Sequence, residues 1–148
     1  MNGLVDILRE NNQKIVFTNG CFDLLHPGHV DYLAKAKAFG DVLMVGLNSD
    51  ASVQTLKGEQ RPINKVMDRL KMLAALEAVD FVIIFEEDTP LKLIQKIKPD
   101  YLVKGGDYSM DNIVGSDFIN ENGGKVEIIP FLNGYSSSEL IEKIKTLK

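Results

Sequence analysis

Five short apolar runs, separated by helical patterns, constrain the fold of this chain more than any other feature. The expected strands are Lys14–Thr18, Val42–Leu47, Phe81–Phe85, Tyr101–Val103 and Val126–Ile129. Strands that alternate with helices form βαβ units, in which the strands run parallel and helices cover both faces of the sheet. We therefore expect an α/β fold with a doubly wound, mainly parallel, five-stranded sheet.

The segments between these strands predict the covering helices and one loop. The expected helices are Gly28–Phe39, Lys65–Val79, Thr89–Ile97 and Ser136–Leu147. Leu56–Asn64 is polar and charged, and a segment of this kind beside an α/β site often forms a mobile cover over a ligand. The 148 residues contain no repeat and no linker, so we predict a single Rossmann-like domain over residues 1–148.

Composition narrows the kinds of partner. The formal net charge is −4, whereas a general nucleic-acid binder normally carries a basic face. No apolar run approaches the roughly 20 residues needed to cross a bilayer, and the N-terminus carries acids early, unlike a secretory signal. A single cysteine cannot form an intramolecular disulfide, which favours the cytoplasm. We expect a cytoplasmic protein whose partners are small molecules rather than nucleic acid or membrane.

The segment Gly20–His29 reads GCFDLLHPGH and follows the first expected strand. Proline suits the first position of a helix because the N–H that it lacks would be unpaired there. With Pro27 at that position, His26 caps the helix and His29 lies in its first turn, so the two imidazoles share a face. The free N–H groups and the positive end of the helix dipole point the same way. The segment therefore predicts a site that binds phosphate.

A metal site or chance placement would account for the histidine pair less well. Zinc sites usually provide three or four protein ligands, but His26 and His29 are the only histidines and Cys21 is the only cysteine. A closed metal site would need carboxylates as well, and we expect no protein metal site. Chance placement is disfavoured because both histidines fall around a Pro-Gly directly after a strand. Neither the dinucleotide fingerprint G-x-G-x-x-G nor the P-loop motif occurs in the chain.

Polar residues follow four of the expected strands. They are Thr18–Gly20, Asn48–Asp50, Lys104–Asp107 and Gly134–Ser138. Each segment alone is explained by turns or helix caps. However, ligands of doubly wound sheets bind beyond the carboxyl ends of the strands. The gathering of these residues at one edge of the sheet therefore predicts the binding site.

These motifs resemble those of a known enzyme superfamily. The core His26–His29 is similar to the H-x-G-H signature of nucleotidyltransferases, which include cytidylyltransferases and several adenylyltransferases. Further matching segments are Gly46–Ser52, Leu56–Gly58, Arg61–Asn64, Glu86–Pro90 and Val103–Tyr108. Together they resemble the D-glycero-β-D-manno-heptose 1-phosphate adenylyltransferase family over nearly the whole chain. In that family this domain is either separate or fused behind a sugar kinase, and we expect the stand-alone form.

The resemblance implies transfer of AMP from ATP to heptose 1-phosphate, which gives ADP-heptose and pyrophosphate. ATP is then a substrate that carries Mg²⁺ mainly on its triphosphate, and a sugar 1-phosphate is the second substrate. By resemblance, His26, His29 and Lys57 are the catalytic residues, which donate hydrogen bonds or charge to the phosphates in the transition state. The family and the apolar helix Lys65–Val79 are also compatible with a homodimer.

Binding roles follow from the same resemblance. The implied nucleotide-binding residues are Asn19, Gly20, Cys21, Phe22, Asp23, Gly28, Gly106, Asp107, Ser136, Ser137 and Ser138. The implied substrate-binding residues are Asn48, Asp50, Arg61 and Arg69. Asp23 is expected to position either Mg²⁺ or the loop. The alternative for Arg69 is a pair with Glu77 or exposure to solvent. Cys21 is interpreted as a small packing residue, because no base is evident that would make it a nucleophile.

Two alternative functions stay open. One is a cytidylyltransferase for a polyol or alcohol phosphate such as glycerol 3-phosphate. Enzymes of that kind carry an arginine shortly before the serine cluster, and Phe131–Gly134 contains none. The other is a catalytically silent nucleotide-binding module. The joint presence of His26, His29, Lys57 and the serine cluster argues against it.

Overall fold

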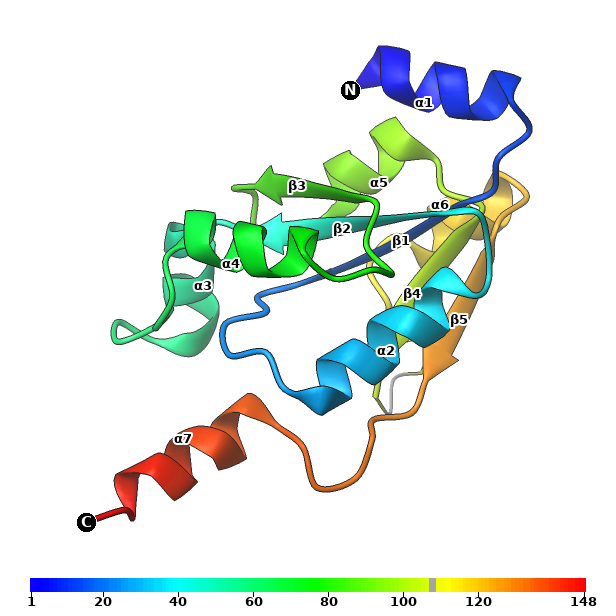
Figure 1. Cartoon of the computed structure of the whole chain (residues 1–148). Coiled ribbons are helices and arrows are strands. Elements are labelled where there is room, and N and C mark those ends of the chain that lie inside the picture. The colour runs from blue at the N-terminus through cyan, green and yellow to red at the C-terminus, as the bar shows by residue number, and fades with distance from the viewer. Residues whose placement is uncertain (107–108) are drawn as a thin grey trace.

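A parallel sheet forms the centre of the computed structural model, which describes residues 1–106 and 109–148 (Figure 1). The strands are β1 (Ile15–Gly20), β2 (Val42–Asn48), β3 (Phe81–Phe85), β4 (Tyr101–Gly105) and β5 (Lys125–Ile129). Their order is β3-β2-β1-β4-β5, and every neighbouring pair is parallel. The predicted fold class, an α/β Rossmann-like sheet of five parallel strands, is confirmed.

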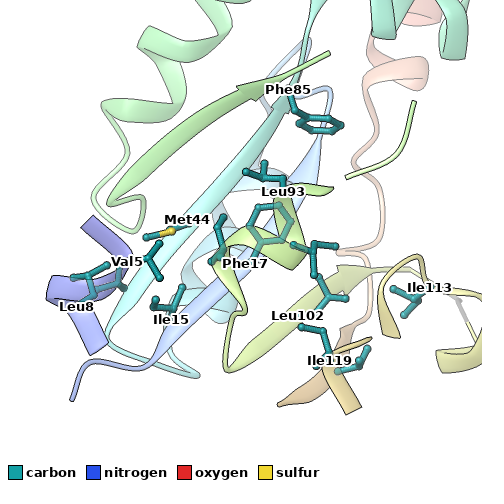
Figure 2. Packing of buried hydrophobic residues seen from close by; sticks show 14 residues of the cluster. Val5, Leu8, Ile15, Phe17, Met44, Phe85, Leu93, Leu102, Ile113 and Ile119 are labelled. Atoms are coloured by element: carbon teal, nitrogen blue, oxygen red, sulfur yellow. The ribbon is translucent and has the colours of Figure 1, made fainter. Parts of the chain in front are cut away.

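Helices cover both faces of the sheet. The helices are α1 (Asn2–Glu10), α2 (Pro27–Lys37), α3 (Asp50–Lys57), α4 (Val66–Ala74), α5 (Leu91–Ile97), α6 (Ser116–Glu121) and α7 (Ser137–Lys145), with a 3₁₀ turn η1 (Met110–Asn112). Helices α1, α5 and α6 pack on one face around Phe17 and Leu102 (Figure 2), whereas α2 and α4 pack on the other face around Val16 and Leu43. Each face buries its own apolar cluster, as expected of a doubly wound sheet.

Several helix boundaries differ from the predicted ones. The predicted helix Lys65–Val79 ends at Ala74, so Glu77 lies outside it. The predicted loop Leu56–Asn64 begins too early, because Lys57 is the last residue of α3. Helices α1 and α6 were not predicted, and neither was α3, which ends at Lys57 beside the cleft. Helix α3 starts at a Ser49 cap whose side chain accepts from the Ser52 N–H, and only Ser52 and Val53 are buried within it. With one buried apolar residue in eight, its sequence gives only a weak signal of a packed helix.

The sheet opens between β1 and β4. The two strands pair only at Val16–Tyr101 and Phe17–Leu102, whereas β1 pairs with β2 along all six of its residues. The strand order also reverses at this point, and ligands of open α/β sheets bind in the crevice that such a reversal creates. Tyr32 of α2 joins the two strands at the base of the crevice. Its hydroxyl group lies 2.7 Å from Thr18 Oγ1 and donates to the Val103 carbonyl at 3.1 Å.

Helix α7 is the least integrated element. None of its residues is buried, and in Figure 1 it extends away from the sheet. Its first turn is nevertheless fixed, because the Ser137 hydroxyl donates to the Leu24 carbonyl at 2.9 Å. Among the described residues, no helix is long and apolar enough to cross a membrane.

Candidate active site

A cleft of about 470 Å³ lies beyond the carboxyl ends of β1, β2 and β4. It brings together most of the residues that the sequence motifs singled out. They are Asn19, Gly20, Cys21, Phe22, Asp23, His26, Gly28, His29, Asn48, Lys57, Arg61, Ser136, Ser137 and Ser138. Three predicted residues lie outside its lining, namely Asp50, Arg69 and Gly106, and Asp107 lies outside the described residues. The volume suits a small-molecule ligand.

The two histidines form a reciprocal cap at the start of α2. His26 is the N-cap residue and Pro27 is the first helical residue, as predicted. The Gly28 N–H donates to His26 Nδ1 at 3.1 Å, and the His26 N–H donates to His29 Nδ1 at 3.3 Å. The imidazole rings lie 3.9 Å apart between centroids. The pair therefore holds both rings at the free end of the helix.

These backbone bonds fix which nitrogen of each imidazole carries the proton. Burial lowers the pKa of His26, and burial together with the neighbouring His26 lowers the pKa of His29 to about 4. Both rings are consequently neutral near pH 7. Since Nδ1 accepts in both rings, the proton of each sits on Nε2. The cleft thus has two neutral N–H donors at the positive end of a helix dipole, an arrangement that favours bound phosphate.

Position 28 must be a glycine because the capping imidazole of His26 lies very close to its backbone. A Cβ atom at position 28 would lie 2.8 Å from His26 Cε1 and 3.1 Å from Tyr135 Cβ. The His26 and Tyr135 rings stack with a centroid distance of 6.1 Å. A larger residue at position 28 would therefore displace the capping imidazole or the segment that precedes α7.

The serine cluster forms a second helix start in the same cleft. Ser136 caps α7 by accepting from the Glu139 N–H at 3.0 Å, and Ser137 binds the Leu24 carbonyl. Ser136, Ser137 and Ser138 all line the cleft. The N-terminal ends of α2 and α7 therefore converge on one space, which suits the several negative charges of a triphosphate.

Asp23 fastens the loop after β1 to the segment before α4. Its buried carboxylate accepts from Arg61 Nε at 2.7 Å and from the N–H groups of Ile63 and Asn64 at 2.8 Å. Burial alone would raise the pKa of Asp23, but the hydrogen bonds from Asn64, Ile63 and Arg61 outweigh it and the pKa is lowered. Of the two expectations for Asp23, the contacts support positioning of the loop.

Arg69 is buried, which rules out the alternative to its predicted substrate-binding role, namely a pair with Glu77 or exposure to solvent. Its side chain is 0% exposed, and Nη2 donates to Asp50 Oδ1 at 2.8 Å. Nη1 donates to the carbonyls of Cys21 and Asn48, and Nε donates to the Asn64 carbonyl. Four guanidinium N–H bonds are thus used inside the protein. Arg69 and Asp50 hold the loops after β1 and β2 together and lie behind the cleft rather than in it.

The cleft also contains residues to which the motifs assigned no role. They are Tyr32, Leu56, Asp88, Pro90, Lys104, Gly105, Phe131, Leu132 and Tyr135. Gly105 lines the cleft at the position where the motif predicted Gly106. Gly106 itself is buried, has a φ of +104°, and a Cβ atom there would lie 2.7 Å from the Phe131 ring. Several of these residues could have been identified from the sequence, because they follow the apolar runs of β4 and β5. The segments after the strands of a parallel sheet gather at its carboxyl edge, where ligands bind.

Cys21 and the acidic residues show what chemistry the cleft can support. Burial raises the pKa of the Cys21 thiol even though Lys57, Arg69 and Arg61 act in the opposite direction. The thiol is therefore protonated near neutral pH and a poor nucleophile. Among the described residues, no group of three His, Cys, Asp or Glu side chains could hold a metal ion. The arrangement instead suits the binding and positioning of anions.

Matches to known proteins agree with this geometry. The cytidylyltransferase-like family model matches residues 17–143. The chain is 55% identical over 142 residues to the bifunctional protein HldE of Geobacter metallireducens and 59% identical over 145 residues to that of Campylobacter jejuni subsp. jejuni serotype O:2. These matches cover 96% and 98% of this chain but 29% and 31% of the relatives, so the chain spans about three tenths of their length.

A solved structure shows the same fold. A lipopolysaccharide core biosynthesis protein from Thermoplasma volcanium superposes with a TM-score of 0.66 at 29% sequence identity. The superposition covers 84% of this chain and 99% of that protein. The resemblance drawn from the sequence motifs is thus confirmed at the level of family and fold.

Replacing Asp23 with Asn should destabilise the protein in a pH-dependent way. Charge-assisted hydrogen bonds contribute roughly 1.5–3 kcal/mol each, so we expect a loss of about 2 kcal/mol or more in the free energy of unfolding at pH 7. Because the folded pKa is lowered, this stabilisation is present above the unfolded pKa of about 4 and is lost as the pH falls through the folded pKa. Urea unfolding of the wild type and the variant at pH 7 and near pH 3 measures the loss of stability and its dependence on pH.

The matched control is Asp31→Asn, which removes a half-exposed carboxylate paired with Lys35 on α2. That change should alter the free energy of unfolding by at most about 0.5 kcal/mol at either pH. If the free energy of unfolding at pH 7 falls equally little in Asp23→Asn and in Asp31→Asn, Asp23 does not hold the two loops together.

Proposed function

The chain belongs to the cytidylyltransferase-like family, and we propose that it transfers the AMP moiety of ATP to a heptose 1-phosphate, giving ADP-heptose and pyrophosphate. The observation that carries the proposal is the convergence of two helix starts on one cleft with two Nε2–H donors between them. Such a site suits a triphosphate whose charge shifts during reaction, because fixed donors need no reorganisation in the transition state.

The reaction needs no nucleophile from the protein. An oxygen of the sugar phosphate attacks the α-phosphorus of ATP, a new P–O bond forms, and the bond to the oxygen bridging the α- and β-phosphates breaks. The electron pair leaves with pyrophosphate. His26 and His29 donate from Nε2 to the phosphate oxygens as charge develops, and Lys57 at the end of α3 supplies a flexible cation.

Mg²⁺ enters this proposal with the triphosphate. The ion is usually held through one or two carboxylates, substrate phosphates and water. The carboxylate of Asp23 is already occupied by Arg61, Ile63 and Asn64 and is therefore not free to hold the ion. Among the described residues that line the cleft, Asp88 is the other carboxylate. The chain's own part is then to bind the phosphates that carry the ion.

The choice of heptose 1-phosphate and ATP rests on the relatives. Chains named bifunctional HldE match this one at 55–59% identity over nearly its whole length. They are about three times longer, and we take the matched third to be their adenylyltransferase part. The lack of an arginine in Phe131–Gly134 agrees with this choice over a glycerol 3-phosphate cytidylyltransferase. An enzyme that uses ATP and a sugar phosphate would act in the cytoplasm.

A nucleotide panel tests the proposed function. We expect Mg²⁺-dependent pyrophosphate release from ATP only when D-glycero-β-D-manno-heptose 1-phosphate is present. ATP without the sugar phosphate, and ATP with Mg²⁺ removed by chelation, are the controls. Equal or faster release from CTP with glycerol 3-phosphate would make the protein a cytidylyltransferase. Tight nucleotide binding without release under any pairing would make it a silent binding module.

Replacing His29 with Ala should lower kcat by roughly 100-fold or more, because removal of one preorganised donor to a transition state typically costs 10²–10³-fold. Nucleotide affinity should change far less, since the donor acts mainly in the transition state. Steady-state kinetics and equilibrium binding of an ATP analogue separate the two effects. The control is Val30→Ala, an exposed change in the same turn of α2. A normal kcat for His29→Ala would remove this histidine from the chemistry.

A further inference from the structure

Lys104 is a partly buried cation inside the cleft that the function described so far does not use. It lies near the end of β4 and is among the residues that line the cleft. Burial lowers the pKa of its ammonium group, and the nearby Cys21 acts in the opposite direction. A lysine is rarely taken out of water without a partner, because the desolvation of its charge is costly. A bound anion would supply that partner.

Asn19 lies near the end of β1, the strand next to β4 in the sheet. Phe17 of β1 pairs with Leu102 of β4, and both side chains pack in the cluster beneath α1, α5 and α6. Successive side chains of a strand alternate between faces, so Asn19 and Lys104, each two residues further on, are directed to that same face. Asn19 Oδ1 is buried, and within residues 1–106 and 109–148 it has no hydrogen-bond partner. An acceptor and a cation thus flank the opening between β1 and β4.

These two residues and the histidine pair come from opposite sides of the sheet. His26 and His29 belong to the start of α2, whose Leu33 and Ala36 pack in the cluster on the other face. On the Lys104 side the cleft is bordered by Asp88 and Pro90, which lie between β3 and α5. The cleft therefore has two parts that meet over the ends of β1 and β4.

In a phosphoryl-type transfer, the leaving pyrophosphate and the attacking phosphate lie roughly in line on opposite sides of the reacting phosphorus. Each of the two parts of the cleft can therefore hold one of these anions. If the starts of α2 and α7 hold the leaving pyrophosphate, the attacking phosphate must approach from the face to which Lys104 and Asn19 are directed. We propose that Lys104 binds the phosphate of the acceptor substrate and that Asn19 Oδ1 accepts a hydrogen bond from an acceptor hydroxyl group.

This inference rests on the proposed function and deepens it, because it names the residues that recognise the second substrate. It also moves Asn19 from the nucleotide, where the motif resemblance placed it, to the acceptor. A partly buried ammonium suits this task better than a fully exposed one, since the attraction between opposite charges is stronger where less water screens it. Lys57, which is exposed, then remains with the triphosphate.

The test compares Lys104→Met, Lys104→Arg and the control Lys125→Met, an exposed change at the start of β5. Calorimetry measures the affinity of each protein for a nonhydrolysable ATP analogue with a methylene group between the α- and β-phosphates. It then measures heptose 1-phosphate binding with the analogue present. We expect Lys104→Met to lose at least 30-fold in acceptor affinity, to change analogue affinity less than threefold, and to melt at or above the wild-type temperature. Lys104→Arg should retain part of the acceptor affinity.

Several results would overturn the inference. Loss of analogue affinity with unchanged acceptor affinity would place Lys104 at the nucleotide. Unchanged affinity for both, or an equal loss with Lys125→Met, would show that Lys104 has no specific role. If Lys104→Met melts at a lower temperature and loses affinity for both ligands to the same extent, Lys104 is a structural residue.

The outcome is separable from that of the proposed function. If the wild type binds glycerol 3-phosphate or α-D-glucose 1-phosphate instead of heptose 1-phosphate, the proposed substrate is wrong. The Lys104 comparison is then made with the acceptor that does bind, and the same thresholds apply. If the wild type binds none of these phosphate monoesters, the inference is contradicted together with the substrate.

Discussion

The separation of β1 from β4 is the constraint on which the rest of this structure depends. Neighbouring strands of a parallel sheet normally stay paired, but here the order of strands reverses and pairing stops after two residue pairs. The chain that leaves β1 runs towards α2, and the chain that leaves β4 runs towards α6 on the other face. A crevice opens between them at the point where the strand order reverses. Tyr32 fixes its width through contacts to both strands.

The polar residues around this crevice fall into two groups. Some use their charge within the protein, and others are available to a ligand. Asp23 and Arg69 use their charges inside the protein. Asp23 binds the segment before α4, and Arg69 of α4 binds the segments after β1 and β2. The two histidines are neutral and act as N–H donors. Lys57 and Lys104 add positive charge to the lining of the cleft. Anions can therefore be held in a protein whose overall charge is negative.

The parts of the fold that depend on local sequence could be predicted, and the parts that depend on distant contacts could not. The start of α2 was predictable because Pro27 and His26 determine it within a few residues. Helix α3 was not, because it is short and of its residues only Ser52 and Val53 are buried, so little of its sequence marks a packed helix face. The five strands were found because each is a continuous apolar run.

The same distinction holds for the candidate site. The H-x-G-H motif located the donors, since both histidines lie on one turn of a helix. Arg69 was misplaced because its partners, Cys21, Asn48 and Asp50, lie 19 to 48 residues away and no local pattern reveals them. Lys104 received no role of its own because a lysine near a glycine pair resembles any surface turn. Its burial emerges only when the sheet places β4 beside β1.

The central claim is that one cleft holds two phosphates in line, so that the acceptor attacks the α-phosphorus directly. The stereochemical course of the reaction tests this claim most directly. With a single diastereomer of ATP that carries sulfur on the α-phosphorus, ³¹P spectroscopy of the product determines its configuration. A single in-line displacement predicts inversion at phosphorus. Retention would require two displacements through a covalent nucleotidyl-protein and would contradict the account.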